Sequence, residues 1–444
     1  MDRAALAEMT AWKSSARRKP LVLLGARQVG KTWLLKEFAR REYDRAVYLS
    51  LDQSPVARSI FDQDLDVQRI VADIATLDGR GPIDPGHTLL ILDEVQEAPR
   101  ALTSLKYFAE NAPQYHVACA GSLLGIASHQ GTSFPVGKVN FIQVRPLTFA
   151  EFMDGIGETG LAGLLRDGDP TRFSPFHDTL VTHLRSFLFV GGMPEAVNEY
   201  AADRDFAAAR AVHEELLAAY DQDFSKHAPV AEVPRLRAVF DSVPRQLARE
   251  NKRFVYRQAQ PGAGAARMEV AMQWLKGAGL VHQVNRVQVP RLPLAAYMDQ
   301  AFKLYLLDVG LVGAAAGLDS RTLLEGSRAF TEFKGALTEQ FVLQELIAAG
   351  LRPFYWANGS GTAEVDFVVE SAGAIVPIEV KAEVNVQAKS LRVFRDAFDP
   401  RRSLRLSLRQ YRDESWLVNL PLYAASLVGR LTAEDEDLRE RIPA

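Results

Sequence analysis

The sequence predicts an α/β fold with a parallel sheet near its N-terminus, and three observations lead to this prediction. A short apolar segment, residues 21–24, runs into a glycine-containing loop and then into residues 33–40, whose apolar positions have helical spacing. A second apolar segment, residues 88–92, ends in two carboxylates. A helix-like segment, residues 330–349, precedes two strand-like segments, residues 363–369 and 375–381. Strands and helices mixed along the chain in this way are typical of α/β folds.

The loop at residues 25–32 follows the phosphate-binding pattern G-x-x-x-x-G-K-[ST]. Its glycines let successive backbone N–H groups turn toward one anion. Lys31 would place a positive charge on the β- and γ-phosphates, and Thr32 would offer a hydroxyl to Mg²⁺. A strand before the loop and a helix after it aim a helix N-terminus at the phosphates. The expected nucleotide-binding residues are Gly25, Ala26, Arg27, Gln28, Val29, Gly30, Lys31, Thr32 and Trp33.

Two carboxylates and one hydroxyl are the expected partners of this loop. Asp93 and Glu94 follow a buried strand, which would carry them to the carboxyl edge of the sheet beside the loop. Asp93 would hold the Mg²⁺ shell through water, and Glu94 would polarise the attacking water. A further strand is expected at residues 115–120, and Gly121 and Ser122 follow it. The hydroxyl of Ser122 would contact the γ-phosphate or cap the following helix, and the sequence leaves both roles open.

The middle of the chain predicts a winged-helix module. Residues 236–250 and 267–278 have the apolar spacing of amphipathic helices, and residues 280–289 and 302–308 have that of strands. Helices followed by a two-stranded wing often read DNA by placing one helix in the major groove. The second helix carries few cations for neutralising phosphates, so DNA contact and structural packing stay equal alternatives.

The C-terminal part carries four polar residues in a recognisable order. Glu339 lies in a predicted helix, Asp366 on the polar phase of a strand, and Glu379 and Lys381 on one face of the next strand. This is the layout of PD-(D/E)XK nucleases. Carboxylates at Glu339, Asp366 and Glu379 would bind Mg²⁺ at a scissile phosphate, and Lys381 would stabilise the developing charge. We therefore predict Asp366, Glu379 and Lys381 as catalytic residues of a metal-dependent DNA endonuclease, or alternatively an inactive relative that binds or assembles.

The densest basic segment spans residues 392–412. Arginine suits bidentate contacts with phosphate, so this segment is a candidate surface for nucleic acid. The alternative is a solvated face balanced by nearby aspartates. The arginines are Arg392, Arg395, Arg401, Arg402, Arg405, Arg409 and Arg412.

Bulk properties limit the class of protein. A chain of 444 residues is long enough for about three domains, and its net charge of −3 confines any nucleic-acid surface to a local patch. The single cysteine, Cys119, excludes disulfides and a cysteine-based zinc site. No apolar run reaches membrane-spanning length and no secretory signal begins the sequence, so a cytoplasmic protein is expected.

Five short segments of the sequence resemble segments of a known protein family. They are residues 19–32, 92–96, 120–122, 145–152 and 191–194. Together they resemble a prokaryotic family of AAA+-type P-loop ATPases with a C-terminal restriction-nuclease-like domain, and the resemblance covers most of the chain. It implies that the nucleotide is ATP and that the helical segment containing residues 191–194 forms a lid. It also implies the winged helix, but it selects no arginine finger.

The patterns and the resemblance together predict four parts. These are a P-loop ATPase core at 1–165, a helical lid at 166–230, a winged-helix-like module at 231–325 and a nuclease-like α/β domain at 326–444. The expected function is Mg²⁺-dependent ATP hydrolysis coupled to a DNA-binding, nuclease-like domain for DNA handling or defence. The alternative is an ATP-switched assembly or scaffold protein, acting as a homo-oligomer or with a protein partner. A protein remodeller ranks last, because no aromatic–hydrophobic pore loop is apparent.

Overall fold

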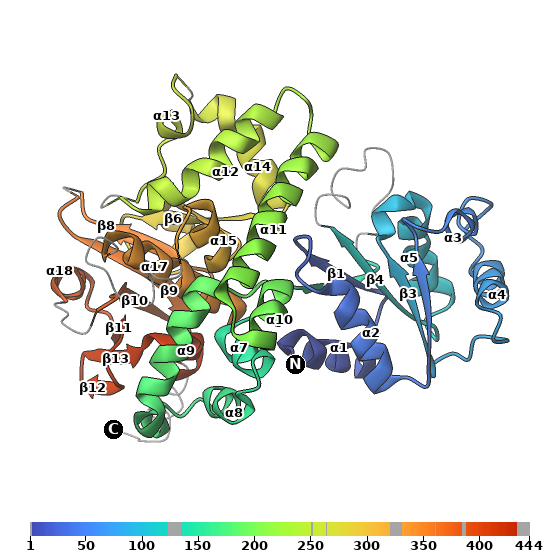
Figure 1. Cartoon of the computed structure of the whole chain (residues 1–444), viewed down its shortest axis with the longest axis horizontal. Coiled ribbons are helices and arrows are strands. Elements are labelled where there is room, and N and C mark those ends of the chain that lie inside the picture. The colour runs from blue at the N-terminus through green and yellow to red at the C-terminus, as the bar shows by residue number, and fades with distance from the viewer. Residues whose placement is uncertain are drawn as a thin grey trace. The chain divides into compact units, whose positions relative to one another are not determined.

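A computed structural model describes residues 2–122, 135, 137–249, 252–262, 264–319, 331–359, 361–383 and 388–432. These residues form two compact units (Figure 1). The N-terminal unit is residues 2–145, with which Gly277–Gly279 group, and the C-terminal unit is the rest of the chain from Pro146. Among the described residues, no helix has the length and apolar character needed to cross a membrane.

The N-terminal unit is built on a five-stranded parallel sheet in the order β2-β3-β4-β1-β5, which confirms the expected parallel sheet. Its strands are β1 (Leu21–Gly25), β2 (Arg45–Ser50), β3 (Thr88–Asp93), β4 (His116–Ser122) and β5 (Asn140–Gln143). All six residues of β3 are buried. A strand that packs on both faces needs such a continuous apolar run, which is why residues 88–92 have no polar alternation.

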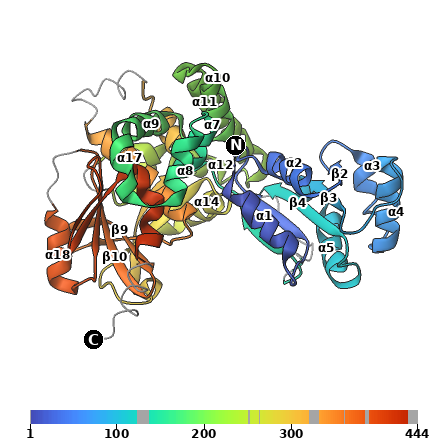
Figure 2. The same ribbon diagram turned by 90° about the horizontal axis from the view of Figure 1, so that it is seen from below.

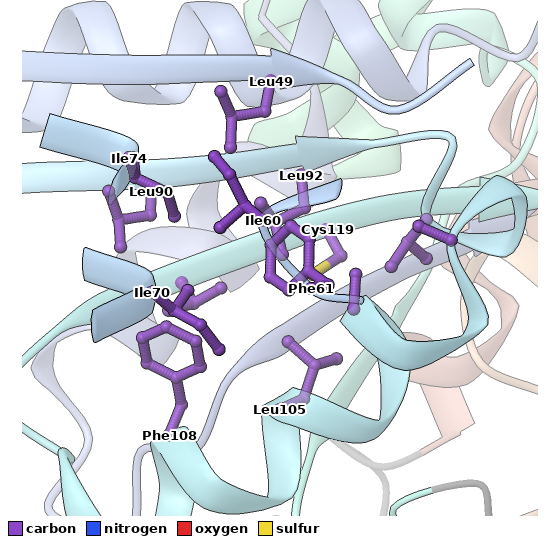
Figure 3. Packing of buried hydrophobic residues seen from close by; sticks show 14 of the residues in the cluster. Leu49, Ile60, Phe61, Ile70, Ile74, Leu90, Leu92, Leu105, Phe108 and Cys119 are labelled. Carbon is purple, nitrogen blue, oxygen red and sulfur yellow. The ribbon is translucent and has the colours of Figure 1, made fainter. Parts of the chain in front are cut away.

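Helices cover this sheet and form its core. They are α1 (Ala4–Ser14), α2 (Lys31–Glu42), α3 (Pro55–Ser59), α4 (Val67–Asp78), η1 (Val95–Glu97) and α5 (Pro99–Asn111). Figure 3 shows Ile70 and Ile74 of α4 and Leu105 and Phe108 of α5 packed with strand residues such as Leu92. Each such side chain contributes about 1.5–3 kcal/mol by burial. Cys119 belongs to this cluster, and burial raises the pKa of its thiol.

The C-terminal unit contains an eight-stranded mixed sheet in the order β12-β13-β11-β10-β9-β8-β6-β7. Its strands are β6 (Val281–Val287), β7 (Met298–Leu306), β8 (Phe354–Ala357), β9 (Glu364–Ser371), β10 (Ala374–Val380), β11 (Ser403–Ser407), β12 (Arg412–Glu414) and β13 (Leu417–Pro421). The two strands expected as a wing, β6 and β7, pair antiparallel, and β6 also pairs with β8. One sheet therefore runs across the boundary expected at residues 325 and 326.

Helices precede and cover this sheet. They are α7 (Phe149–Gly155), α8 (Thr159–Asp167), η2 (Pro170–Phe176), α9 (His177–Val190), α10 (Pro194–Asp203), α11 (Phe206–His227), α12 (Val233–Leu247), α13 (Tyr256–Ala259), α14 (Ala265–Gly277), η3 (Leu294–Tyr297), α15 (Val309–Ala315), α17 (Thr331–Ala348), α18 (Lys389–Phe398) and η5 (Leu422–Leu427). Figure 2 shows α18 beside the strands, and its Phe394 packs against Trp356 of β8.

One buried carboxylate joins several of these elements. Asp308, between β7 and α15, accepts hydrogen bonds from the backbone N–H of Gly192 (2.7 Å) and Gly310 (2.8 Å) and from the Gln344 side chain (3.1 Å). Burial raises the pKa of Asp308, and these donors act against the rise. This carboxylate thus holds the Gly-Gly turn that the family resemblance assigns to a lid against the start of α15, within the C-terminal unit.

Replacing Asp308 with alanine is expected to lower the free energy of unfolding of the C-terminal unit by about 3 kcal/mol, because buried N–H groups of Gly192 and Gly310 lose their acceptor. Urea unfolding followed by circular dichroism measures this loss. Asp203→Ala, at an exposed aspartate of α10, is the matched control and should leave the transition in place. Equal transitions for the two variants would contradict the structural role of Asp308.

Candidate functional site

The glycine loop is a tight turn between β1 and α2. Its last residue, Gly30, has φ 90°, in the left-handed region where glycine is favoured. Gly25, at the start, passes so close to the neighbouring chain that an added Cβ would lie 2.4 Å from the carbonyl oxygen of Val144. Gly30 is required by its left-handed backbone and Gly25 by the lack of space for a Cβ, so the backbone of the loop explains both glycines of the pattern. The exposed Trp33 stands in the first turn of α2.

Lys31 is buried at the start of α2 and folds back over the loop. Its Nζ donates hydrogen bonds to the carbonyl oxygens of Gly25 (3.1 Å) and Ala26 (2.8 Å). Burial lowers the pKa of Lys31 to about 8, although the carboxylates of Glu94 and Asp93 favour its charged form. An ammonium group held among loop carbonyls can exchange these acceptors for the oxygens of a bound phosphate.

Asp93 ends β3 and connects three elements of the N-terminal unit. Its Oδ2 accepts a hydrogen bond from the hydroxyl of Thr32 on α2 (2.8 Å) and another from the hydroxyl of Tyr48 on β2 (2.7 Å). Thr32 and Asp93 thus lie together as the sequence predicted. Hydroxyl and carboxylate oxygens are ligands that Mg²⁺ prefers, with water and phosphate completing the shell, so this pair fits the expected ion.

Tyr48 and Gln96 are parts of this site that the sequence analysis missed. Tyr48 reaches Asp93 only because β2 pairs with β3 in parallel, with Ser50 opposite Asp93. Pairing between strands is a tertiary fact, so the sequence near Tyr48 carries no signal of it. Gln96 contacts the Oε2 of Glu94 through its Nε2. Its position two residues after Glu94 is the one signal that could have identified it.

Glu94 has a backbone conformation that is rare outside glycine. Its φ is 52° and its ψ is 47°, and its N–H donates to the Oδ1 of Asp93 (3.1 Å). Non-glycine residues in this left-handed region cost roughly 1–2 kcal/mol and concentrate at functional sites. The backbone of Ser122 lies opposite Gly25 in the β1–β4 pairing, beside the loop.

The C-terminal polar residues also lie together. Asp366 on β9 accepts a hydrogen bond from the N–H of Val380 (2.8 Å), which ties it to β10. Lys381 forms an ion pair with the Oε1 of Glu379 (2.9 Å). The other oxygen of Glu379, Oε2, is buried, and no hydrogen-bond donor contacts it within the described part of the chain. Burial raises the pKa of Asp366 to about 7, and the charge of Glu339 adds to the rise.

Glu339 on α17 is enclosed by lysines that the sequence analysis did not identify. Lys303, buried on β7, places its Nζ 3.7 Å from Glu339 Oε2 and 2.6 Å from Glu364 Oε1. Lys252 contacts Oε1 of the same glutamate. Burial alone would raise the pKa of Glu339, but the two ammonium groups lower it to about 2. These lysines supply the positive charge that a metal ion would bring.

Whether a metal ion fits the C-terminal cluster depends on which of its carboxylates are available as ligands. No group of three or more His, Cys, Asp or Glu side chains that could hold a metal ion occurs among the described residues. Both oxygens of Glu339 face ammonium groups, so it could act as a ligand only after Lys252 and Lys303 moved away. Asp366 and Glu379, with its unpaired buried oxygen, fit a cation that completes its shell with water.

Several arginines of the segment at residues 392–412 are engaged by neighbouring side chains. Arg402 pairs with Asp413 (3.1 Å), and Arg412 pairs with Glu414 (3.3 Å). Arg395 pairs with its neighbour Asp396. Arg405 is buried, and its Nε donates to the side chain of Asn419 (3.1 Å). The arrangement favours the alternative of a balanced surface over a phosphate-binding patch.

Comparison with protein families divides the chain into three matched segments. Residues 17–153 match a family described as AAA domain. Residues 181–322 match a domain of unknown function (DUF8612), and residues 334–423 match another (DUF4143). The chain therefore carries an AAA-type P-loop ATPase domain followed by two domains of unknown function. No protein of curated function matches it.

The solved structures that match the chain are remote in sequence, and their TM-scores are low. A Walker-type ATPase of Pyrococcus abyssi, paby2304, has 16% identity and a TM-score of 0.43, with 71% of this chain and 95% of that chain covered. The Orc1 protein of Aeropyrum pernix, solved in complex with DNA, has 13% identity and a TM-score of 0.28, with coverages of 70% and 90%. The RuvB Holliday junction branch migration motor of Thermotoga maritima has 15% identity and a TM-score of 0.28, with coverages of 64% and 87%.

Proposed function

We propose that the protein binds ATP with Mg²⁺ at the loop of residues 25–33 and hydrolyses it. One observation carries this proposal: the hydroxyl of Thr32 lies 2.8 Å from the carboxylate of Asp93, and the buried ammonium group of Lys31 stands beside them. The two segments are 61 residues apart in sequence. Their meeting next to a glycine loop joins a phosphate contact to a metal contact.

Each residue of the site has a proposed role. Lys31 binds the β- and γ-phosphates and neutralises charge that develops between them. Thr32 would hold the Mg²⁺ ion directly and Asp93 would hold its shell through water, and the ion would supply positive charge at the phosphates. Glu94 orients and polarises the attacking water. Ser122, at the end of β4, contacts the γ-phosphate or that water.

The contact between Gln96 and Glu94 bears on when hydrolysis occurs. While Gln96 donates a hydrogen bond to the Oε2 of Glu94, this oxygen is a weaker acceptor for a proton from water. The hydroxyl of Tyr48 likewise shares the Asp93 oxygen with Thr32. We infer that both contacts change when ATP occupies the loop, so that the side chains of β2 and η1 respond to the nucleotide.

For the C-terminal part we propose a nuclease-like, DNA-binding domain whose state depends on ATP. The cluster of Asp366, Glu379 and Lys381 supports catalysis, because two carboxylates and a lysine are what metal-dependent phosphodiester cleavage requires. The antiparallel β6–β7 pair after α12 and α14 supports the winged-helix-like assignment of residues 231–325. The four-part division of the chain stays a proposal.

A second candidate function has its own supporting observation. Lys252 and Lys303 already balance the charge of Glu339, so the cluster can be stable without any metal. This favours an ATP-switched assembly or scaffold protein, acting as an oligomer or with a protein partner, whose nuclease-like domain does not cleave. Measurement of cleavage separates the two functions.

Replacing Lys31 with alanine is expected to lower ATP turnover by about 100-fold or more, because a preorganised cationic donor to the phosphates is lost. Release of inorganic phosphate from Mg²⁺–ATP measures turnover, and circular dichroism checks the fold. Lys106→Ala removes an exposed lysine of α5 in the same unit and should keep parental turnover. Undiminished hydrolysis by the Lys31 variant would contradict the proposed phosphate contact.

Binding of ATP is expected to weaken as the pH rises through about 8, the pKa of Lys31 in the free protein. Burial lowers this pKa, so the ammonium form that attracts phosphate falls from about nine-tenths at pH 7 to about one-tenth at pH 9. The apparent Kd should therefore rise about tenfold between these pH values. Calorimetric titration with a slowly hydrolysed ATP analogue measures it. Lys31→Arg stays protonated throughout, and the same pH dependence in that variant would rule out Lys31 as its source.

If the C-terminal cluster is catalytic, Asp366→Ala and Lys381→Ala should abolish Mg²⁺-dependent cleavage of DNA, since each removes a group at the scissile phosphate. Gel analysis of linear, circular and single-stranded DNA, with and without ATP, measures cleavage. Lys389→Ala, at an exposed lysine of α18, is the control and should cleave like the parent. Cleavage by all variants would refute the catalytic assignment, whereas its absence in the parent would support the scaffold function.

A further inference from the structure

A cavity of about 750 Å³ lies in the C-terminal unit at the end of α12. Its lining comes from α13, from the chain between α12 and α13, from Gly264 just before α14 and from β7, and Figure 1 labels α12, α13 and α14 in this part of the unit. Among the described residues, the lining includes three arginines, two glutamines and no carboxylate. The lining residues are Arg249, Arg253, Phe254, Val255, Tyr256, Arg257, Gln258, Gly264, Gln300 and Phe302.

Specific contacts build the floor of this arginine pocket. The N–H of Phe254 donates to the carbonyl oxygen of Phe302 on β7 (2.8 Å), and the two rings stack with their centroids 5.4 Å apart. The N–H of Val255 donates to the side chain of Gln246, which is buried on α12 (2.7 Å). The segment carrying Arg253 and Arg257 is therefore held against the edge strand of the sheet, and its arginines emerge from a fixed backbone.

Positive charge is concentrated in the pocket, and no carboxylate lines it among the residues that the structure describes. Within the described residues, no ion pair joins Arg249 or Arg257 to a carboxylate. The nearby Asp299 already accepts from Arg286 (2.9 Å) and Gln288 (2.8 Å), so its charge is satisfied elsewhere. In addition, α14 begins directly after Gly264, which lines the pocket, and the N-terminus of a helix adds positive potential.

We propose that the arginine pocket binds the phosphate backbone of duplex DNA. The inference deepens the proposed DNA-binding function by naming the residues that make the contact. Arginine presents a planar set of donors that matches phosphate oxygens in bidentate fashion, and three arginines around one hollow suit neighbouring phosphates of a strand. The contact reads no base, so it positions DNA without selecting a sequence.

The aromatic rings favour duplex DNA over a single strand. Single-stranded nucleic acid stacks its bases on exposed aromatic faces. Phe254 and Phe302 are each only 5% exposed and stack on one another, which leaves Tyr256 as the one partly exposed aromatic ring in the described lining. One such ring offers little stacking beside three arginines, so the pocket offers a ligand chiefly charge and hydrogen-bond donors, which a duplex satisfies through its phosphates.

Fluorescence anisotropy with a labelled DNA duplex, at several salt concentrations and without nucleotide, tests the proposal on the full chain. Arg249→Gln and Arg257→Gln should each weaken binding roughly tenfold and equally on two unrelated sequences. Each should also reduce the slope of log K against log salt by about one. Arg245→Gln is the matched control, because Arg245 is exposed on α12 but does not line the pocket.

The outcomes separate this inference from the proposed ATPase. All variants should keep parental ATP turnover, and circular dichroism checks that the C-terminal unit folds. Parental affinity and salt slope in a combined Arg249→Gln, Arg253→Gln, Arg257→Gln variant would overturn the proposal, as would a parent that hydrolyses ATP but binds no duplex. Displacement of the duplex by equimolar tripolyphosphate would also overturn it, since the ligand would then be a free phosphate compound. A parent that binds duplex through these arginines without hydrolysing ATP would refute the ATPase alone.

Discussion

The carboxylate of Asp93 is the interaction on which the nucleotide site depends. It accepts hydrogen bonds from Thr32 on α2 and from Tyr48 on β2, and its other oxygen accepts from the backbone of Glu94. One side chain thus sets the distance between the glycine loop, the neighbouring strand and the residue proposed to polarise water. The close approach of Gly25 to Val144 fixes the loop from the other side. Between these two constraints the phosphate-binding backbone has little freedom, which is how a site becomes preorganised for a charged ligand.

In the C-terminal unit, buried charged side chains likewise hold separate elements together. Asp308 satisfies backbone N–H groups from two segments far apart in sequence, and Lys303 occupies the centre of an acidic cluster. A buried charge is tolerated only with partners, so each of these residues constrains the elements around it. The balance at Glu339 explains how a set of residues in the order typical of metal-dependent nucleases can be stable without an ion. Asp366 and Glu379 are then the residues that a bound metal ion would still stabilise.

Charge in this chain also illustrates why a basic segment is a poor guide to a basic surface. The arginines at residues 392–412 are dense in sequence, yet Arg402 and Arg412 lie against carboxylates and Arg405 is buried. Residues 249–257 are also rich in cations, with Arg249, Lys252, Arg253 and Arg257 in nine residues. Arg249 and Arg257 line one pocket only because the segment between them is hydrogen-bonded to β7. Whether a cation is neutralised depends on its neighbours in space.

The sequence alone determined the parallel sheet, the glycine loop and the partnership of Thr32 with Asp93, because these follow from local patterns that allow few geometries. It also placed Asp366, Glu379 and Lys381 near one another, since adjacent strands carry residues of the same phase to one face. Only the tertiary structure decided the roles of Tyr48 and Lys303 and the extension of the C-terminal sheet by β6 and β7. These depend on strand pairing and on burial between distant segments, for which no local pattern of residues carries a signal.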